Sequence, residues 1–146
     1  MFFLFFVVIL AILIRIAAHL FTRRSTKAIK FVGPRGTGKT RTLNALMGIN
    51  GKTVPTLETY KVTYKNMVVY DVVQRDGDFF ERYGIDDPLV TYFFFLGSVD
   101  DLAELPETKG FDIRFVCCKQ DDCKKALGKN IIVLDKDPTQ IEKYFL

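Results

Sequence analysis

The sequence has no tryptophan, a single histidine and only three cysteines. The cysteines, Cys117, Cys118 and Cys123, fall within one short segment, and the histidine, His19, lies far from them. Structural zinc sites take four Cys or His ligands, so an odd number of cysteines in one cluster argues against a zinc site. Free thiols in a reducing compartment are the simplest interpretation. Internal repeats and low-complexity tracts are also absent.

Charge is scarce at the N-terminus, where no acidic or basic side chain precedes Arg15. As a helix, the largely apolar residues 1–21 would cover about 31 Å, which matches a bilayer core of about 30 Å. Arg15 is near enough to the end of this run to extend its side chain toward the interface. We therefore expect residues 1–22 to form a transmembrane anchor. A cleaved signal peptide is the alternative, but it would carry positive charge before the apolar run.

The net charge of +4 is concentrated directly after this segment, in Arg23, Arg24, Lys27 and Lys30. Such a cluster can bind nucleic acid, but its position favours anionic lipid head groups, so we expect a lipid bilayer as partner and no direct nucleic acid. The same charge predicts that the N-terminus crosses the membrane and the rest of the chain stays in the cytosol. After a basic linker at residues 23–27, residues 28–146 suffice for one domain.

Glycine gathers in residues 33–40, whose sequence GPRGTGKT fits the phosphate-binding loop pattern G-x-x-x-x-G-K-[ST]. An apolar, strand-like run (residues 28–32) precedes it and a helical stretch (residues 41–47) follows it, as the motif requires. The glycines let the backbone wrap a phosphate chain with its N–H groups pointing inward. Lys39 would reach the β- and γ-phosphates, and the Thr40 hydroxyl would ligate Mg²⁺. The loop alone leaves the choice between ATP and GTP open.

The rest of the chain predicts an α/β fold. Residues 59–64 alternate in polarity and residues 67–73 are apolar, so a turn at Lys65-Asn66 would join them as an antiparallel hairpin. Further strands are expected at residues 89–96, 111–117 and 131–134, and helices within residues 98–110, 118–128 and 138–146. Strands that alternate with helices after a phosphate-binding loop indicate a mainly parallel sheet with helices on both faces.

The order of these features resembles the small GTPases over nearly the whole chain. Asp71 ends a buried strand where that family's Asp-x-x-Gly motif begins. Residues 54–58 (VPTLE) resemble the first switch segment, with Thr56 at the position that senses Mg²⁺. Cys118-Lys119-Gln120-Asp121 resembles the Asn-Lys-x-Asp motif that reads guanine. The domain is therefore expected to be a P-loop GTPase-like one, reduced in size.

The resemblance is strongest to the Arf, Sar and signal-recognition-particle-receptor branch, and an N-terminal anchor is typical there of the signal recognition particle receptor beta subunits. That family implies a single-pass protein of the endoplasmic reticulum membrane, facing the cytosol, whose GTP form holds the receptor's alpha subunit for protein targeting. It implies GTP and Mg²⁺ as cofactors, with Mg²⁺ at Thr40 and Thr56. The implied binding residues are Gly33, Pro34, Arg35, Gly36, Thr37, Gly38, Lys39, Thr40, Arg41, Thr56, Asp71, Cys118, Lys119 and Asp121.

The sequence departs from the family's motifs in two places. Cys118 replaces the usual Asn, which exchanges an amide for a weak thiol donor. The segment that starts at Asp71 lacks the glycine of the Asp-x-x-Gly motif, whose N–H meets the γ-phosphate in the family. Gln74 stands in its place, and it is either a displaced water-positioning residue or a surface residue. Hydrolysis is therefore expected to be slow or dependent on a partner. Another Arf-like GTPase, a P-loop ATPase or kinase fragment, and a pseudo-GTPase scaffold that holds nucleotide remain as alternatives.

Overall fold

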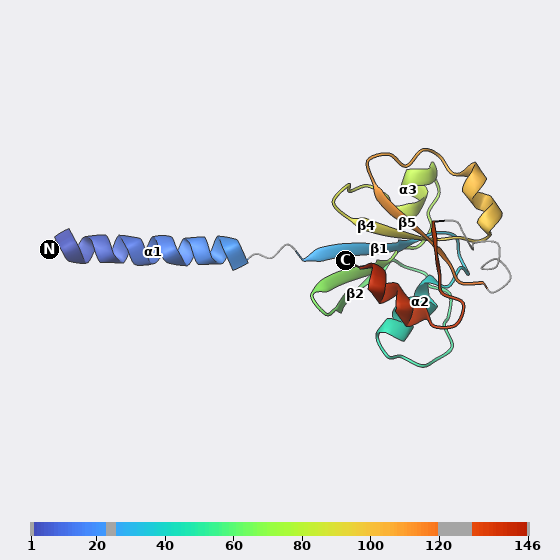
Figure 1. Cartoon of the computed structure of the whole chain (residues 1–146), viewed down its shortest axis with the longest axis horizontal. Helices are drawn as coiled ribbons and strands as arrows, with labels where there is room; N and C mark the ends of the chain where they lie inside the picture. Colours follow the sequence, from blue (N-terminus) through green and yellow to red (C-terminus); the bar gives the residue numbers. More distant parts are fainter. Residues whose placement is uncertain (1, 23–25, 120–129, 146) are drawn as a thin grey trace.

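A computed structural model of the chain describes residues 2–22, 26–119 and 130–145. Figure 1 shows helix α1 (Phe2–Thr22) set apart from a domain that is built on a six-stranded sheet in the described residues. The helix that we expected within residues 118–128 falls almost wholly outside the described residues, as does Asp121.

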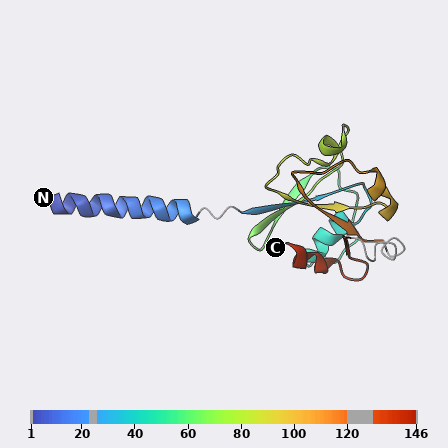
Figure 2. The same ribbon diagram turned by 45° about the horizontal axis from the view of Figure 1, so that its top comes forward.

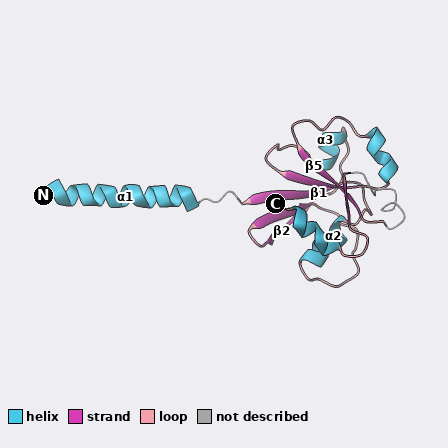
Figure 3. Cartoon of the chain, viewed as in Figure 1, coloured by secondary structure: helices cyan, strands magenta, loops and turns pink. Residues whose placement is uncertain are grey.

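The strands of the domain are β1 (Lys27–Val32), β2 (Tyr60–Tyr64), β3 (Met67–Asp71), β4 (Thr91–Phe95), β5 (Asp112–Cys117) and β6 (Ile131–Val133). Its helical elements are α2 (Lys39–Leu46), α3 (Phe79–Tyr83) and the 3-10 helices η1 (Val99–Glu104) and η2 (Pro138–Tyr144). In the described residues the strand order is β2-β3-β1-β4-β5-β6, and only the pairing of β2 with β3 is antiparallel. Figure 3 shows the strands, in magenta, gathered into one sheet between the helices of the domain. The prediction of a mixed α/β fold with a mainly parallel sheet is confirmed.

The predicted transmembrane helix is wrong. In the part of the chain that the structure describes, no helix is both long enough and apolar enough to cross a membrane. The prediction assumed that Arg15 could extend its side chain to the interface, so that the whole of α1 would count as one span. The uncharged stretch before Arg15, residues 2–14, covers only about 20 Å of a bilayer core of about 30 Å.

The predicted hairpin is present as β2 and β3. Tyr64 pairs with Met67 at the closed end of the hairpin, and Tyr60 pairs with Asp71 at the open end. Lys65 in the turn has a φ of 53°, the left-handed conformation that tight hairpin turns require. This register places the segment between α2 and β2 beside Asp71, one of the predicted site residues.

Helices cover both faces of the sheet, so the expectation from the sequence is confirmed. Figures 1 and 2 show α3 on one side of the sheet and α2 with η2 on the other. Alternation along β4 builds both cores, because successive side chains of a strand point to opposite faces. Phe93 and Phe95 join the cluster under α2 and η2, whereas Tyr92 and Phe94 join the cluster under α3.

The C-terminal element η2 is fastened along the sheet by polar contacts. The Tyr64 hydroxyl donates to Glu142 Oε2 at 2.8 Å, and Lys65 forms an ion pair with the same carboxylate. Lys27 Nζ donates to the carbonyl oxygen of Phe145 at 2.6 Å. These contacts tie η2 to the hairpin turn and to the start of β1.

Three of the expected elements differ in detail. The strand predicted over residues 89–96 begins at Thr91, because Asp87 caps a turn before it by accepting a hydrogen bond from the Leu89 N–H at 2.9 Å. Leu89 is consequently 90% exposed. The segments after β4 and β6 form the 3-10 helices η1 and η2, which start at the capping side chains of Ser98 and Asp137.

The aromatic core yields a test of the fold. Phe93 is fully buried, with its ring centroid 5.9 Å from that of Phe31 and 5.5 Å from that of Phe145. Phe93→Ala should lower the free energy of unfolding by about 3–5 kcal/mol, because it leaves a cavity in the core. Leu89→Ala is the control and should change it by no more than about 0.5 kcal/mol. Urea unfolding measures both, and equal losses would contradict this placement of β4.

Candidate functional site

The glycine-rich loop joins the end of β1 to the start of α2, as the sequence predicts. Gly33, Gly36 and Gly38 have φ values of 129°, 73° and 100°, in the region that side chains disfavour. Gly33 is the most constrained, because a Cβ added there would lie 2.4 Å from the carbonyl oxygen of Phe95 on the neighbouring strand β4. The close approach of these two strands therefore requires glycine at the start of the loop.

Lys39, the first residue of α2, turns its side chain back over the loop. Its Nζ donates to the carbonyl oxygens of Gly33 at 2.8 Å and Pro34 at 2.7 Å. Burial lowers the pKa of Lys39, the negative charge of Asp71 opposes this effect, and the nearby Arg35 adds to it. The ammonium group is thus held at the mouth of the loop by two carbonyl groups of the loop itself.

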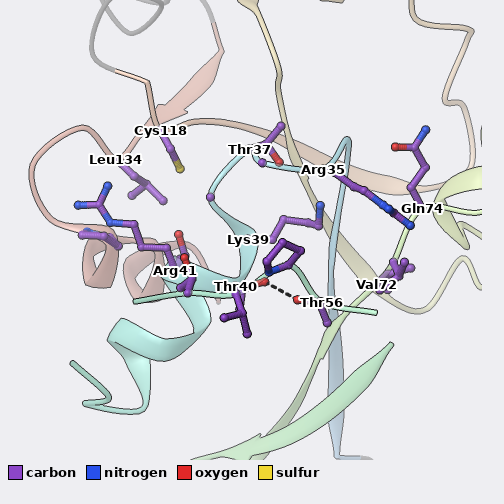
Figure 4. Close-up of a pocket in the computed structure, with 18 of the residues that line it drawn as sticks. Arg35, Thr37, Lys39, Thr40, Arg41, Thr56, Val72, Gln74, Cys118 and Leu134 are labelled. Atoms are coloured by element: carbon purple, nitrogen blue, oxygen red, sulfur yellow. Dashed lines mark hydrogen bonds between the residues drawn. The ribbon is translucent and has the colours of Figure 1, made fainter. Parts of the chain in front are cut away.

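Three oxygen-bearing side chains from three different segments meet beside the loop. Thr40 Oγ1 donates to Asp71 Oδ2 at 2.6 Å. It also lies 2.9 Å from Thr56 Oγ1, a contact that Figure 4 shows as a dashed line. Thr56 Oγ1 also donates to Asp71 Oδ2, at 3.4 Å. Burial raises the pKa of Asp71, which is 1% exposed, and the Thr40 hydroxyl and the charge of Lys39 oppose this rise.

These groups border a cavity of about 580 Å³, a size that suits a nucleotide. The predicted site residues that line it are Arg35, Gly36, Thr37, Gly38, Lys39, Thr40, Arg41, Thr56, Cys118 and Lys119. The others that the structure describes, Gly33, Pro34 and Asp71, support the lining from behind through their contacts with Lys39 and Thr40. Most residues singled out in the sequence therefore surround one space.

The far end of the cavity is formed by Cys118, which follows β5. A Cβ added to Gly38 would lie 3.2 Å from its sulfur, so the thiol lies against the glycine-rich loop. Burial raises the pKa of the Cys118 thiol to about 11, and the Thr42 hydroxyl offsets this only in part. Lys119 Nζ donates to the Gly97 carbonyl at 3.3 Å. The cavity therefore has a neutral thiol, rather than an amide or a thiolate, at this end.

The cavity is also lined by residues that were not predicted as site residues, among them Leu134 and Pro138 near the C-terminus. Leu134 follows β6, and its backbone N–H donates to the Cys117 carbonyl at 2.8 Å. Ligands of open parallel sheets bind outside the carboxyl ends of the strands, so the residues after β5 and β6 should meet at the site. That rule, applied to residues 131–138, was the signal available in the sequence.

The oxygen groups beside the loop suit Mg²⁺. Among the described residues no group of three or more His, Cys, Asp or Glu side chains could hold a metal ion. Mg²⁺ needs no such cluster, because it prefers hard oxygen ligands and usually takes only one or two from the protein, with waters and phosphate oxygens completing the shell. The hydroxyls of Thr40 and Thr56, beside the buried Asp71 carboxylate, fit that requirement.

A scan against protein-family models and a search of curated proteins found no match to this chain. The function is therefore argued from the geometry of the site.

The burial of Asp71 makes a testable difference to stability. Its pKa is raised above the usual 3.8, so between the two values the folded state binds more protons than the unfolded state. Stability therefore falls as the pH rises through this window. Asp71→Asn should remove that fall, because an amide can still accept from Thr40 without a buried charge. Without nucleotide and at neutral pH, the variant should be more stable than the wild type in urea unfolding.

The matched control is Asp76→Asn, which neutralises an exposed carboxylate and should leave the pH dependence unchanged. If Asp71→Asn and Asp76→Asn gave the same dependence of unfolding free energy on pH, the buried anion assigned to Asp71 would be refuted.

Proposed function

We propose that this chain binds a guanine nucleoside triphosphate together with Mg²⁺ and acts as a nucleotide-dependent binding protein. The observation that carries the proposal is the meeting of Thr40, Thr56 and Asp71 beside the glycine-rich loop. Thr56 belongs to no strand or helix, so no backbone ladder requires its hydroxyl to lie 2.9 Å from that of Thr40. A shared ligand, Mg²⁺ with a phosphate chain, accounts for this arrangement.

The loop supplies the phosphate side of the site. Its backbone N–H groups and the first turn of α2 offer partial positive charge to an anion. Lys39 adds a full charge beside the Gly33 and Pro34 carbonyls. A phosphate chain in the cavity would therefore meet donors along its length, whereas a neutral ligand would leave them unsatisfied.

Bound Mg²⁺ would neutralise charge between the outer phosphates. Thr40 and Thr56 would hold it through their hydroxyl oxygens. Asp71 would accept hydrogen bonds from those hydroxyls or from metal-bound water, which keeps their oxygen lone pairs directed at the ion. Because these three residues belong to separate segments, loss of the outer phosphate would release Thr56 and its neighbours.

The preference for guanine rests on the resemblance of residues 118–121 to the guanine-reading motif. Asp121, outside the described residues, would accept from the guanine N1–H and exocyclic amine, a pair of donors that adenine lacks. Lys119 lines the cavity and can pack along the base. Binding of ATP by a P-loop ATPase or kinase fragment is the competing proposal, because the loop itself fits both nucleotides.

The output of such a protein would be a contact with another protein. Val54 and Leu57, on either side of Thr56, are 75% and 83% exposed, so nucleotide would control an apolar surface. The receptor alpha subunit as partner and the endoplasmic reticulum as location stay predictions from family resemblance. The lipid bilayer as a second partner stays a prediction from the N-terminal sequence. We do not extend the proposal to them, because the transmembrane anchor that favoured them is wrong.

The loop lysine tests nucleotide binding directly. Lys39→Ala removes the ammonium that meets the phosphates and should weaken binding of Mg²⁺–GTP at least about 100-fold in a calorimetric titration. Lys61→Ala removes an exposed lysine of β2 and should leave the affinity as it was. Unchanged affinity in Lys39→Ala, or no binding by the wild type, would rule out the proposed use of the loop.

Base preference is tested by competition among nucleotides. The wild type should bind GTP more tightly than ATP or XTP. Asp121→Asn should shift the preference from GTP toward XTP, because the amide offers a donor to the C2 oxygen of xanthine and loses the charge that matches guanine. If Asp121→Asn kept the wild-type order of affinities, the guanine assignment would fail while phosphate binding stood.

A further inference from the structure

Arg35 lies in the glycine-rich loop, yet it takes no part in holding the loop together. Its side chain is exposed and lines the cavity. Within the described residues it forms no hydrogen bond or ion pair, in contrast to Lys39, which is anchored on two carbonyl groups. The loop therefore presents one cation that is already engaged and one that is free to engage a ligand.

The position of Arg35 along the cavity defines which part of a ligand it would meet. Figure 4 shows Arg35 and Gln74 on one side of Lys39, with Cys118, Leu134 and Arg41 on the other. Cys118 and Leu134 follow β5 and β6 and form the end proposed for the base. A nucleotide with its base there and its phosphates over Lys39 would direct its outermost phosphate toward Arg35.

The charges around Arg35 favour an anion at this end. Arg35 and Lys39 belong to the same loop and line the same cavity, so two positive charges that repel each other face one space. The one carboxylate near them in the described part of the site is Asp71, which is buried behind Thr40 and Thr56. A terminal phosphate between the two cations would relieve the repulsion, and a diphosphate would not reach this far.

From these observations we propose that Arg35 is a specificity-determining residue that reads the terminal phosphate and makes the site prefer a nucleoside triphosphate to a diphosphate. This inference rests on the proposed function. A guanidinium fork matches phosphate oxygens with two parallel donors, so its contribution depends on geometry as well as charge. A contact made only by the third phosphate changes the ratio of the two affinities, whereas a contact to the inner phosphates would change both alike.

The test is a titration of the full chain, with Mg²⁺, by a non-hydrolysable GTP analogue and separately by GDP. Arg35→Ala should weaken binding of the triphosphate about 10- to 100-fold and leave GDP binding unchanged. Arg35→Lys keeps the charge without the fork and should recover part of the loss. Arg41→Ala, at the opposite end of the cavity, is the matched control and should change both affinities by the same factor.

The unfolding temperatures and the two affinities together separate a role of Arg35 in binding from a role in folding. Because Arg35 is exposed, its variants should unfold at the same temperature as the wild type, which thermal denaturation verifies. Equal effects of Arg35→Ala on the triphosphate and on GDP, or no effect on either, would overturn the role of Arg35 while the proposed function stands. If the wild type bound neither nucleotide, both the proposed function and this inference would fall.

Discussion

The burial of one carboxylate, that of Asp71, constrains everything else at the site. A buried anion is costly unless hydrogen bonds and opposite charge compensate it. Here two threonine hydroxyls and the charge of Lys39 do so, and they come from α2 and from the segment before β2. The antiparallel pairing of Tyr60 with Asp71 brings the segment that carries Thr56 back beside this carboxylate. The hairpin therefore positions a side chain of the site as well as adding a strand to the sheet.

A second constraint is the close approach of β1 and β4. Gly33 lies against the Phe95 carbonyl, where a Cβ has no room, so the loop begins at a position fixed by the sheet. The alternation of large rings along β4 places one hydrophobic core on each side of that junction. The loop therefore rests on β4, a strand that is packed on both faces of the sheet. Side chains held by such a rigid element keep a precise binding geometry.

Much of this arrangement could be predicted from the sequence, because the controlling signals are local. The glycine-rich loop, the hairpin turn and the buried strands can each be recognised from a few adjacent residues. The meeting of Thr40 with Thr56 could be expected only through family resemblance, since it joins segments that no periodicity relates. Leu89 was misassigned because composition does not reveal the turn at Asp87. The apolar stretch of α1 was misassigned because Arg15 was assumed to reach the interface, although the uncharged residues before it are too few to span a bilayer core.

The hydrogen bonds of Lys39 to the loop's own carbonyl groups bear on how fast a ligand could bind. The ammonium group of Lys39 lies over the loop and joins the carbonyl groups of Gly33 and Pro34, which braces the loop with its own side chain. A ligand that enters such a preorganised site meets no loop that must first fold. Its association rate would then be set by diffusion and by the attraction of the surrounding cations, and tuning by mutation would appear mainly in the dissociation rate.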